Sequence, residues 1–269
     1  MTTKSEKATF ASEVHKRAFK KFERRRVIVH KIDEIWAMDL ASLESLVSYN
    51  DGYKYMLCII DVFSKFAWAV ALKNKTAATV LAAVKDVVKK SKRIPEKIWV
   101  DQGSEFYNKS FKDWIQSHNI TMYSTYGESK SVVVERFIRT LKDIATKYFT
   151  EHSTRDWVNN LDTFLHEYNN RKHKTIKMTP VEASKPANEE KVKENFVVDG
   201  KRKSPQLVKG DKVRISRIKD KFEKGYENNW SYEVFTISEV LNTIPPTYKL
   251  IDYFNDPIEG SFYEQELLK

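Results

Sequence analysis

The sequence predicts an α/β protein: a mixed five-stranded sheet with flanking helices, followed by a small all-β barrel at the C-terminus. Apolar side chains alternate with small or polar ones in three segments between residues 35 and 72, as in antiparallel strands. Helical and strand-like segments then alternate to about residue 170, and four or five short strand-like segments follow residue 205. A chain of 269 residues is long enough for one large and one small domain, each with its own core.

Composition indicates a globular protein with a polyanionic partner. Hydrophobic residues make up 41% of the chain and aromatic residues 13%, too many for a disordered protein. The formal net charge of +10 favours a partner such as nucleic acid, although a charge excess also serves solubility alone. No apolar run approaches the ~18 residues of a membrane span and the N-terminus is polar, so we expect a soluble intracellular protein without a membrane partner.

The one cysteine, Cys58, lies in the apolar run "YMLCIIDVF". A single cysteine excludes an internal disulfide and a cysteine-rich zinc site. Apolar surroundings raise the pKa of a thiol, so Cys58 is interpreted as a core residue and not as a catalytic nucleophile.

A strongly basic segment lies near the N-terminus. The run "HKRAFKKFERRRVIVHK" holds eight Lys or Arg residues against one Glu, with Phe19 and Phe22 among them. One interpretation is a DNA-gripping arm or a nuclear-import signal, and the other is the solvated face of a helix. The sequence leaves both open.

Three antiparallel strands are expected after residue 34. In "IWAMDLA" the side chains of Trp36, Met38 and Leu40 share one face, and those of Ala37 and Asp39 share the other. The turn signal "NDG" precedes a second strand in "YKYMLCIIDVF". The third strand, "FAWAVAL", alternates large residues with alanines, which suits a sheet that helices cover closely on the alanine face.

Helices and short strands alternate in the next hundred residues. We expect a helix from about Thr76, a strand at "KIWVD" parallel to its neighbour, a helix around Trp114 and a strand at "ITMYS". The polar loop "TYGESKS" leads into a long helix from about Ser131, and a further helix spans Trp157 to Tyr168. Strands of the C-terminal barrel are expected in "LVKGDKVRIS", "SYEVFTISEV", "TYKLIDY" and "IEGSFYEQEL".

Three acids are candidate site residues because the predicted strands and helix allow their side chains to lie close together. Asp39 stands inside a strand, where aspartate is disfavoured, and Asp101 ends a second strand that can neighbour the first in a mixed sheet. On the long helix, Glu135 lies about 100° from the apolar stripe and therefore at the border between packed and open surface. Two adjacent carboxylates repel unless cations lie between them, and paired divalent cations on carboxylates serve phosphoryl transfer. The predicted stripe consists of Val134, Ile138, Leu141, Ala145 and Tyr148.

The segments around these acids resemble a known family. "IWAMDL", "VDQGSEFYN" and "KSVVVERFIRTLK" are similar to the three acidic motifs of a retroviral-type integrase core, which has a ribonuclease-H-like fold. "DVFSKFAWAVALKNKT" and "YNNRKHKTIKMTPVEA" resemble further landmarks of that core, from about residue 30 to 185. The chain resembles most closely the integrases of Polinton/Maverick transposons, which are related to virophages. Their C-terminal SH3-like or chromo-like barrel and basic leading segment have counterparts here.

The resemblance implies domains and a site. The domains are a basic arm (1–31), a catalytic core (32–185), a linker (186–205) and a barrel that binds DNA or chromatin (206–269). Asp39, Asp101 and Glu135 fall on the three catalytic acids, which implies two Mg²⁺ or Mn²⁺ ions held by these carboxylates. Thirty-three residues separate the second acid from the third, slightly fewer than in retroviral integrases. The retroviral His-His-Cys-Cys module is missing, so no zinc is expected.

Further residues have two interpretations each. Asp61 is interpreted as structural, and Glu105 as an anchor of the turn after Asp101. Trp230, Tyr226 and Tyr232 fit an aromatic cage, but barrel core is the favoured interpretation. The residues expected to contact DNA phosphates are Lys130, Arg136, Arg139, Lys142, Arg24, Arg25 and Arg26.

The expected function is that of a DNA integrase, a polynucleotidyl transferase with associated endonuclease activity. Its partners are double-stranded DNA, both element ends and target, and further copies of the chain, at least as a dimer. In a eukaryotic host the protein acts in the nucleus, and otherwise it is simply intracellular. Two alternatives remain: a domesticated or inactive copy that binds DNA or chromatin, and a ribonuclease-H-like nuclease that hydrolyses without joining.

Overall fold

The computed structural model describes residues 5–19, 22–25, 27–124, 132–196, 204–217 and 227–269. The chain forms two compact units. The core unit is Ile28–Val197, and the terminal unit combines Met1–Val27 with Val198–Lys269. The N-terminal arm therefore belongs to the same unit as the C-terminal strands, although 170 residues of core separate them in sequence.

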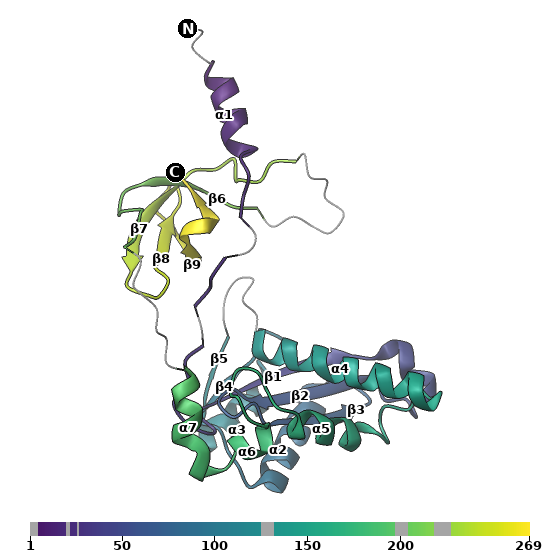
Figure 1. Ribbon diagram of the computed structural model, residues 1–269. Coiled ribbons are helices and arrows are strands. Elements are labelled where there is room, and N and C mark those ends of the chain that lie inside the picture. Colours follow the sequence, from purple (N-terminus) through teal and green to yellow (C-terminus); the bar gives the residue numbers. More distant parts are fainter. Residues whose placement is uncertain (1–4, 20–21, 26, 125–131, 197–203, 218–226) are drawn as a thin grey trace. The chain divides into compact units, whose positions relative to one another are not determined.

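The core unit is built on one mixed sheet with strand order β3-β2-β1-β4-β5 (Figure 1). The first three strands are antiparallel neighbours and β4 runs parallel to β1, as the sequence predicts. Strand β5 in turn pairs with β4 in parallel. The strands are β1 (Ile35–Ser42), β2 (Tyr55–Asp61), β3 (Ala67–Leu72), β4 (Lys97–Trp99) and β5 (Thr121–Tyr123).

Several helices of the core unit begin at side chains that cap them. Thr76 caps α2 by accepting from the backbone N–H of Thr79, and Asn108 caps α3 through the backbone N–H of Phe111. These caps satisfy N–H groups that the first helical turn leaves without partners. The helical elements are η1 (Glu44–Tyr49), α2 (Ala77–Ser91), α3 (Lys109–Ser117), α4 (Val132–His152), α5 (Leu161–Asn170), α6 (Pro180–Ala183), η2 (Pro186–Asn188), α7 (Glu189–Lys193) and η3 (Glu194–Phe196).

The two faces of the sheet carry different helices. Trp36 and Met38 of β1 join the buried cluster that includes α2 and α3, while α4 packs against β1 and β2. The side chains of Ala37 and Asp39 alternate with Trp36 and Met38, so they belong to the α4 face, as predicted.

The buried stripe of α4 differs from the predicted one. It comprises Val134, Phe137, Leu141 and Ile144, and it shares only Val134 and Leu141 with the prediction. The Phe137 ring packs on Tyr168 of α5 with centroids 4.7 Å apart. Helix α4 therefore buries side chains against α5 as well as against the sheet. The predicted stripe assumed packing against the sheet alone.

The edge strand β3 is covered by α5. The buried side-chain amide of Asn169 donates to the backbone oxygen of Ala67 at 2.9 Å and accepts from its N–H at 3.0 Å. It thus takes the hydrogen-bonding place of a further strand on an otherwise open edge. The alanine face of β3 allows this close approach, in agreement with the prediction of a closely covered strand.

Two segments differ from their predicted structure. The last helix of the predicted series begins at Leu161 and leaves Trp157 in the connection before it. Residues 186–196, predicted as linker, form three short helical turns in which Val192 is buried. Short turns with one buried anchor have too little periodicity to stand out from a charged sequence.

The terminal unit contains a five-stranded sheet of order β10-β6-β7-β8-β9, all antiparallel. This confirms the predicted all-β C-terminal part. Its core includes Val213, Ile237, Tyr248 and Leu250, each almost fully buried. The strands are β6 (Lys212–Ile215), β7 (Phe235–Leu241), β8 (Thr247–Ile251), β9 (Pro257–Tyr263) and β10 (Leu267–Leu268).

The N-terminal arm packs on this sheet. After helix α1 (Glu6–Val14), the backbone oxygen of Val14 accepts from the N–H groups of Asn229 and Trp230 at 2.7 and 3.2 Å. The indole N–H of Trp230 donates to the backbone oxygen of Lys16 at 2.7 Å. Trp230 is buried, as expected for a core residue. Its hydrogen bond to Lys16 anchors the N-terminal arm.

No helix in the described parts of the chain is long and apolar enough to cross a membrane.

Candidate active site

Two of the predicted acids lie on or just after neighbouring parallel strands. Strand β1 pairs with β4 so that Ala37 is opposite Trp99, and both chains continue two residues further to Asp39 and Asp101. Asp39 lies further along β1, whereas β4 ends at Trp99 and Asp101 lies in the connection that follows it. Both residues are partly exposed. The prediction that the first and fourth strands are neighbours is therefore confirmed.

Asp39 stands above the packed interior of the α4 face. Its Oδ1 accepts from the N–H of Leu40 at 2.8 Å, and its cross-strand neighbour is Cys58. Burial raises the pKa of the Cys58 thiol far above its usual range, and the negative charge of Asp39 raises it further, whereas Lys142 lowers it. The thiol is thus protonated at neutral pH, and the expectation of a core cysteine agrees with its full burial.

Asp101 begins a tight turn that leads into α3. Its Oδ1 accepts from the N–H of Gly103 at 3.1 Å. The carboxylate of Glu105 folds so close to Gly103 that a Cβ atom there would lie 2.5 Å from it, so a larger residue would displace Glu105. The backbone oxygen of Glu105 accepts from Asn108, the cap of α3. Glu105 therefore belongs to the turn, as the sequence analysis interprets it.

Glu135 lies in the first turn of α4 and is exposed. Its neighbours Val134 and Phe137 are buried against the rest of the core unit, so the helix holds Glu135 at the rim of the packed surface. The preceding residues 125–131 lie outside the described part of the chain, and with them Lys130.

The structure brings Asp39 and Asp101 to one sheet edge but does not gather a complete metal cluster. Among the described residues, no group of three or more His, Cys, Asp or Glu side chains is placed to hold a metal ion. Two partly exposed aspartates near the same end of neighbouring strands nevertheless offer carboxylate oxygens, the ligands that hard divalent cations prefer. A third acid, Glu135, is carried by the helix that covers the same face.

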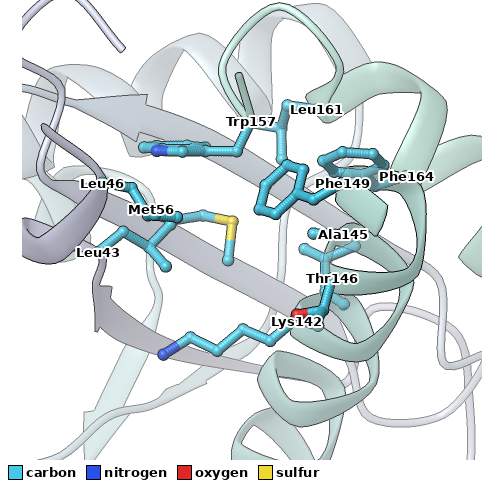
Figure 2. A pocket seen from close by; sticks show the side chains of 11 residues that line it. Leu43, Leu46, Met56, Lys142, Ala145, Thr146, Phe149, Trp157, Leu161 and Phe164 are labelled. Carbon is cyan, nitrogen blue, oxygen red and sulfur yellow. The ribbon is translucent and has the colours of Figure 1, made fainter. Parts of the chain in front are cut away.

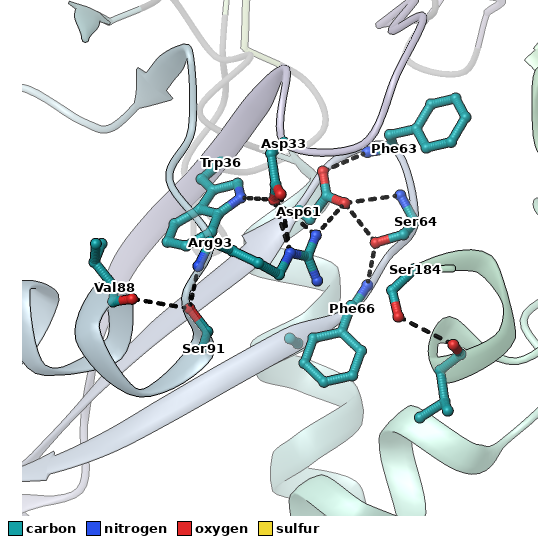
Figure 3. Close-up of polar contacts among 12 residues, drawn as sticks. Asp33, Trp36, Asp61, Phe63, Ser64, Phe66, Val88, Ser91, Arg93 and Ser184 are labelled. Atoms are coloured by element: carbon teal, nitrogen blue, oxygen red, sulfur yellow. Dashed lines mark hydrogen bonds and ion pairs between the residues drawn. The ribbon is translucent and has the colours of Figure 1, made fainter. Parts of the chain in front are cut away.

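Two further acids of the core unit, Asp33 and Asp61, are held by ion pairs and hydrogen bonds (Figure 3). Asp61, fully buried at the end of β2, accepts from the backbone of Phe63 and from Ser64, and pairs with the Arg93 guanidinium at 2.9 Å. The Nη2 and Nε atoms of Arg93 also donate to Asp33 Oδ1, at 2.7 and 3.0 Å. Burial raises the pKa of Asp61, and the Ser64 hydroxyl and Arg93 counteract the rise. Asp61 is structural, as interpreted from the sequence.

Three basic residues influence one another close to the start of α4. Burial lowers the pKa of Lys65 to about 8, with Arg136 adding to the effect. Burial likewise lowers the pKa of His173 to about 4, and the charges of Lys65 and Arg136 contribute, so His173 is neutral at pH 7. Lys65 is buried, whereas Arg136, next to Glu135 in sequence, is exposed. Lys65 and His173 come from distant segments, so no local pattern connects them with Arg136.

The predicted DNA-contacting residues occupy both units. On α4, Arg136 and Arg139 are exposed, and Lys142 is partly buried with its Nζ 3.4 Å from the backbone oxygen of Ser42. In the terminal unit, Arg24 pairs with Glu266 at 3.5 Å and lies over the Phe22 ring. The remaining members of the set stand as follows: Arg25 is exposed, and Arg26 and Lys130 lie outside the described residues.

The aromatic residues of the terminal unit do not form a described cage. Trp230 is buried under the arm, and exposed Tyr232 meets the Phe10 ring of α1 at 5.7 Å. Tyr226, the third member of the set, lies outside the described residues.

Comparison with known proteins finds similarity to integrases in the core unit. Residues 29–126 match the model of the integrase core domain family. A transposon-derived protein of Caenorhabditis elegans is 34% identical over 191 residues, which is 69% of this chain and 63% of that protein. The Gag-Pol polyprotein of feline leukemia virus is 31% identical over 121 residues, 44% of this chain and 7% of the polyprotein.

A chain in the cryo-EM structure of the simian T-cell lymphotropic virus intasome, in complex with the PP2A regulatory subunit B56 gamma, shares the fold. The TM-score is 0.60 at 15% identity, with 91% of this chain and 84% of that chain covered. The mixed sheet of the core unit with its flanking helices therefore has the ribonuclease-H-like fold. The chain spans less than two thirds of the length of the sequence relatives that it matches.

Proposed function

We propose that this chain is the DNA integrase of a mobile element and catalyses divalent-metal-dependent 3′-end processing and strand transfer. The observation that carries the proposal is the parallel pairing of β1 with β4, because Asp39 lies in β1 and Asp101 follows the end of β4 by two residues, within a segment similar to the integrase core domain family. Glu135 follows on the helix that covers the same strands.

The donor set fits hard divalent cations, because all three residues offer carboxylate oxygens. Asp39 and Asp101 would hold one Mg²⁺ or Mn²⁺ together, and Glu135 would complete a second site. Bound there, the two cations would activate the attacking oxygen and stabilise the charge on the leaving oxygen of an in-line displacement. The protein contributes the placement of the acids on a rigid sheet and helix.

The reaction consists of two displacements at phosphorus. A water molecule first attacks a phosphodiester close to the element end and releases a 3′-hydroxyl. That hydroxyl then attacks a phosphodiester of the target, and the target's own 3′-oxygen leaves. Joining two ends calls for at least two copies of the chain, so the working form is an oligomer.

DNA is held by the cationic surface of α4, on which Arg136 and Arg139 are exposed close to Glu135. Phosphate groups of bound DNA would be stabilised there without any readout of base sequence. The terminal unit provides a second DNA or chromatin contact. A Polinton/Maverick-type element and action in the nucleus of a eukaryotic host complete the proposal.

Disintegration of a branched DNA oligonucleotide tests the function directly, because this assay asks little of the end sequence. Wild type and the Glu135→Gln variant are compared in Mg²⁺ and in Mn²⁺. We expect strand release and rejoining with the wild type alone.

The other results would replace the proposal with a named alternative. Cleavage without rejoining would assign a nuclease. No reaction with either metal, from folded protein that still binds DNA, would assign a DNA- or chromatin-binding protein derived from an integrase.

A further inference from the structure

A hydrogen bond joins the turn after Asp101 to the end of the next strand. The hydroxyl of Tyr107 lies 2.6 Å from the Ser124 hydroxyl, across 17 positions of sequence. Ser124 directly follows β5, which pairs with β4 in parallel, and Asp101 follows the end of β4 by two residues. The bond therefore links the segments that leave two neighbouring strands at the same end of the sheet.

The backbone connects Tyr107 to the carboxylate of Asp101 as well. The N–H of Tyr107 donates to the backbone oxygen of Gly103 at 3.0 Å. The N–H of Gly103 in turn donates to Asp101 Oδ1 at 3.1 Å. Three hydrogen bonds in series thus run from Ser124 to one oxygen of Asp101.

The residues on both sides of Tyr107 are fixed. The Phe106 side chain is fully buried and meets the Phe111 ring of α3 edge-on, with centroids 5.8 Å apart. Asn108 caps α3 by accepting from the N–H of Phe111 at 2.9 Å. The Tyr107 side chain itself is 37% exposed, so its ring adds less to the core than that of Phe106. A phenol held in this way sets the distance between the Asp101 turn and the end of β5.

We propose that Tyr107 is a positioning residue for metal binding. Its hydrogen bond to Ser124 braces the Asp101 turn against the end of β5 and keeps the carboxylate in the orientation that takes a divalent cation. The inference rests on the proposed function, in which Asp101 is a metal ligand. Groups that hydrogen-bond behind a metal ligand orient it, and their loss weakens metal affinity by about 10- to 100-fold. Tyr107 acts through the backbone of Gly103, so we expect a smaller loss.

Titration with Mn²⁺ tests the positioning. Binding to the full-length protein is measured from the electron paramagnetic resonance signal of free Mn²⁺, for wild type, Tyr107→Phe, Ser124→Ala and the double variant. Each single variant should raise the dissociation constant about 3- to 10-fold, the equivalent of one hydrogen bond. The double variant should bind no more weakly than either single variant, because both substitutions remove the same bond. Ser124→Thr keeps a hydroxyl and should bind Mn²⁺ as the wild type does.

A separate part of the core unit supplies the control for a loss of stability alone. An apolar pocket of about 120 Å³ lies between η1, β2, α4 and α5, and none of its described lining residues belongs to β4, β5 or α3 (Figure 2). Asn50, 3% exposed, joins its walls by accepting from the backbone N–H of Trp157 and donating to the backbone oxygen of Leu46, both at 2.8 Å. Leu161→Ala removes a buried side chain from this pocket, so it should lower stability to urea and leave Mn²⁺ affinity unchanged. Tyr107→Phe should do the reverse.

Three results would overturn the proposal: wild-type Mn²⁺ affinity in Tyr107→Phe, additive losses in the double variant, or an equal loss of affinity in Leu161→Ala. With any of them, weaker Mn²⁺ binding by Asp101→Asn would still support the proposed metal site. If Asp101→Asn binds Mn²⁺ as tightly as the wild type, or the wild type binds none, the proposed function fails and this inference fails with it.

Discussion

The sheet of the core unit carries aspartates in two contrasting environments. Asp61 is fully enclosed, and backbone N–H groups, the Ser64 hydroxyl and Arg93 surround its oxygens. Asp39 in β1 and Asp101, two residues after the end of β4, remain partly exposed. A carboxylate that serves the fold is buried with a matching cation, whereas carboxylates that would bind metal ions have to remain accessible to solvent. Substitution of Asp101 should therefore lower activity and not stability, and substitution of Asp61 should lower stability.

The largest effect is expected for Asp101→Asn. Losing one carboxylate that would hold a cation should lower strand transfer by about 10³-fold, since metal stabilisation of a phosphoryl-transfer transition state amounts to several kcal/mol. Stability to urea should stay unchanged or rise, because repulsion from Asp39 is relieved. Strand-transfer rates and urea unfolding, measured on the same preparation, check both halves. If Asp101→Asn were destabilised yet active, Asp101 would serve the fold and not the reaction.

Asp61→Asn should show the opposite behaviour. The substitution leaves Arg93 with one of its two acidic partners and should cost about 4 kcal/mol of unfolding free energy. Urea unfolding measures the loss, with Asp101→Asn as the matched control on the neighbouring part of the sheet. A loss below about 1 kcal/mol would mean that the enclosed network contributes little to the fold.

Lys65 extends the comparison to pH. Its pKa is lowered to about 8 in the folded protein, so above that pH the unfolded chain binds more protons than the folded one. Wild-type stability should therefore rise between pH 8 and 10.5, by up to about 3 kcal/mol more than that of Lys65→Met. Thermal or urea unfolding across this range gives the difference. Parallel curves for the two proteins would contradict the lowered pKa.

The smallest effect is expected for Arg139→Ala, with Arg93→Met as the contrasting control. Arg139→Ala, on the exposed side of α4, should weaken DNA binding several-fold without loss of stability and reduce the salt dependence by about one ion. Arg93→Met should instead destabilise the protein, because it leaves two acids beside each other. Fluorescence anisotropy at several salt concentrations, together with unfolding curves, separates the two roles. Equal salt slopes for wild type and Arg139→Ala would remove this residue from the DNA-binding surface.

Local patterns were sufficient to predict much of the fold and the strand acids. The alternation in "IWAMDLA" and "FAWAVAL" follows from the two-residue period of a strand, and the crossover rule predicts that β4 runs parallel to β1. The unusual position of Asp39 inside a strand was visible without coordinates. The exact buried stripe of α4 was not, because the contact of Phe137 with Tyr168 depends on a second helix.

By itself, the sequence determined the order of strands and helices in the core, the all-β C-terminal part and the pairing of the first strand with the fourth. Only the tertiary structure decided that the basic arm packs on the C-terminal sheet, that Arg93 joins Asp33 to Asp61, and that Asn50 encloses a pocket beside Trp157. The physical reason is the range of the interactions. Strand and helix periods are set by neighbouring residues, whereas these polar contacts join segments 30 to more than 200 positions apart and leave no local pattern.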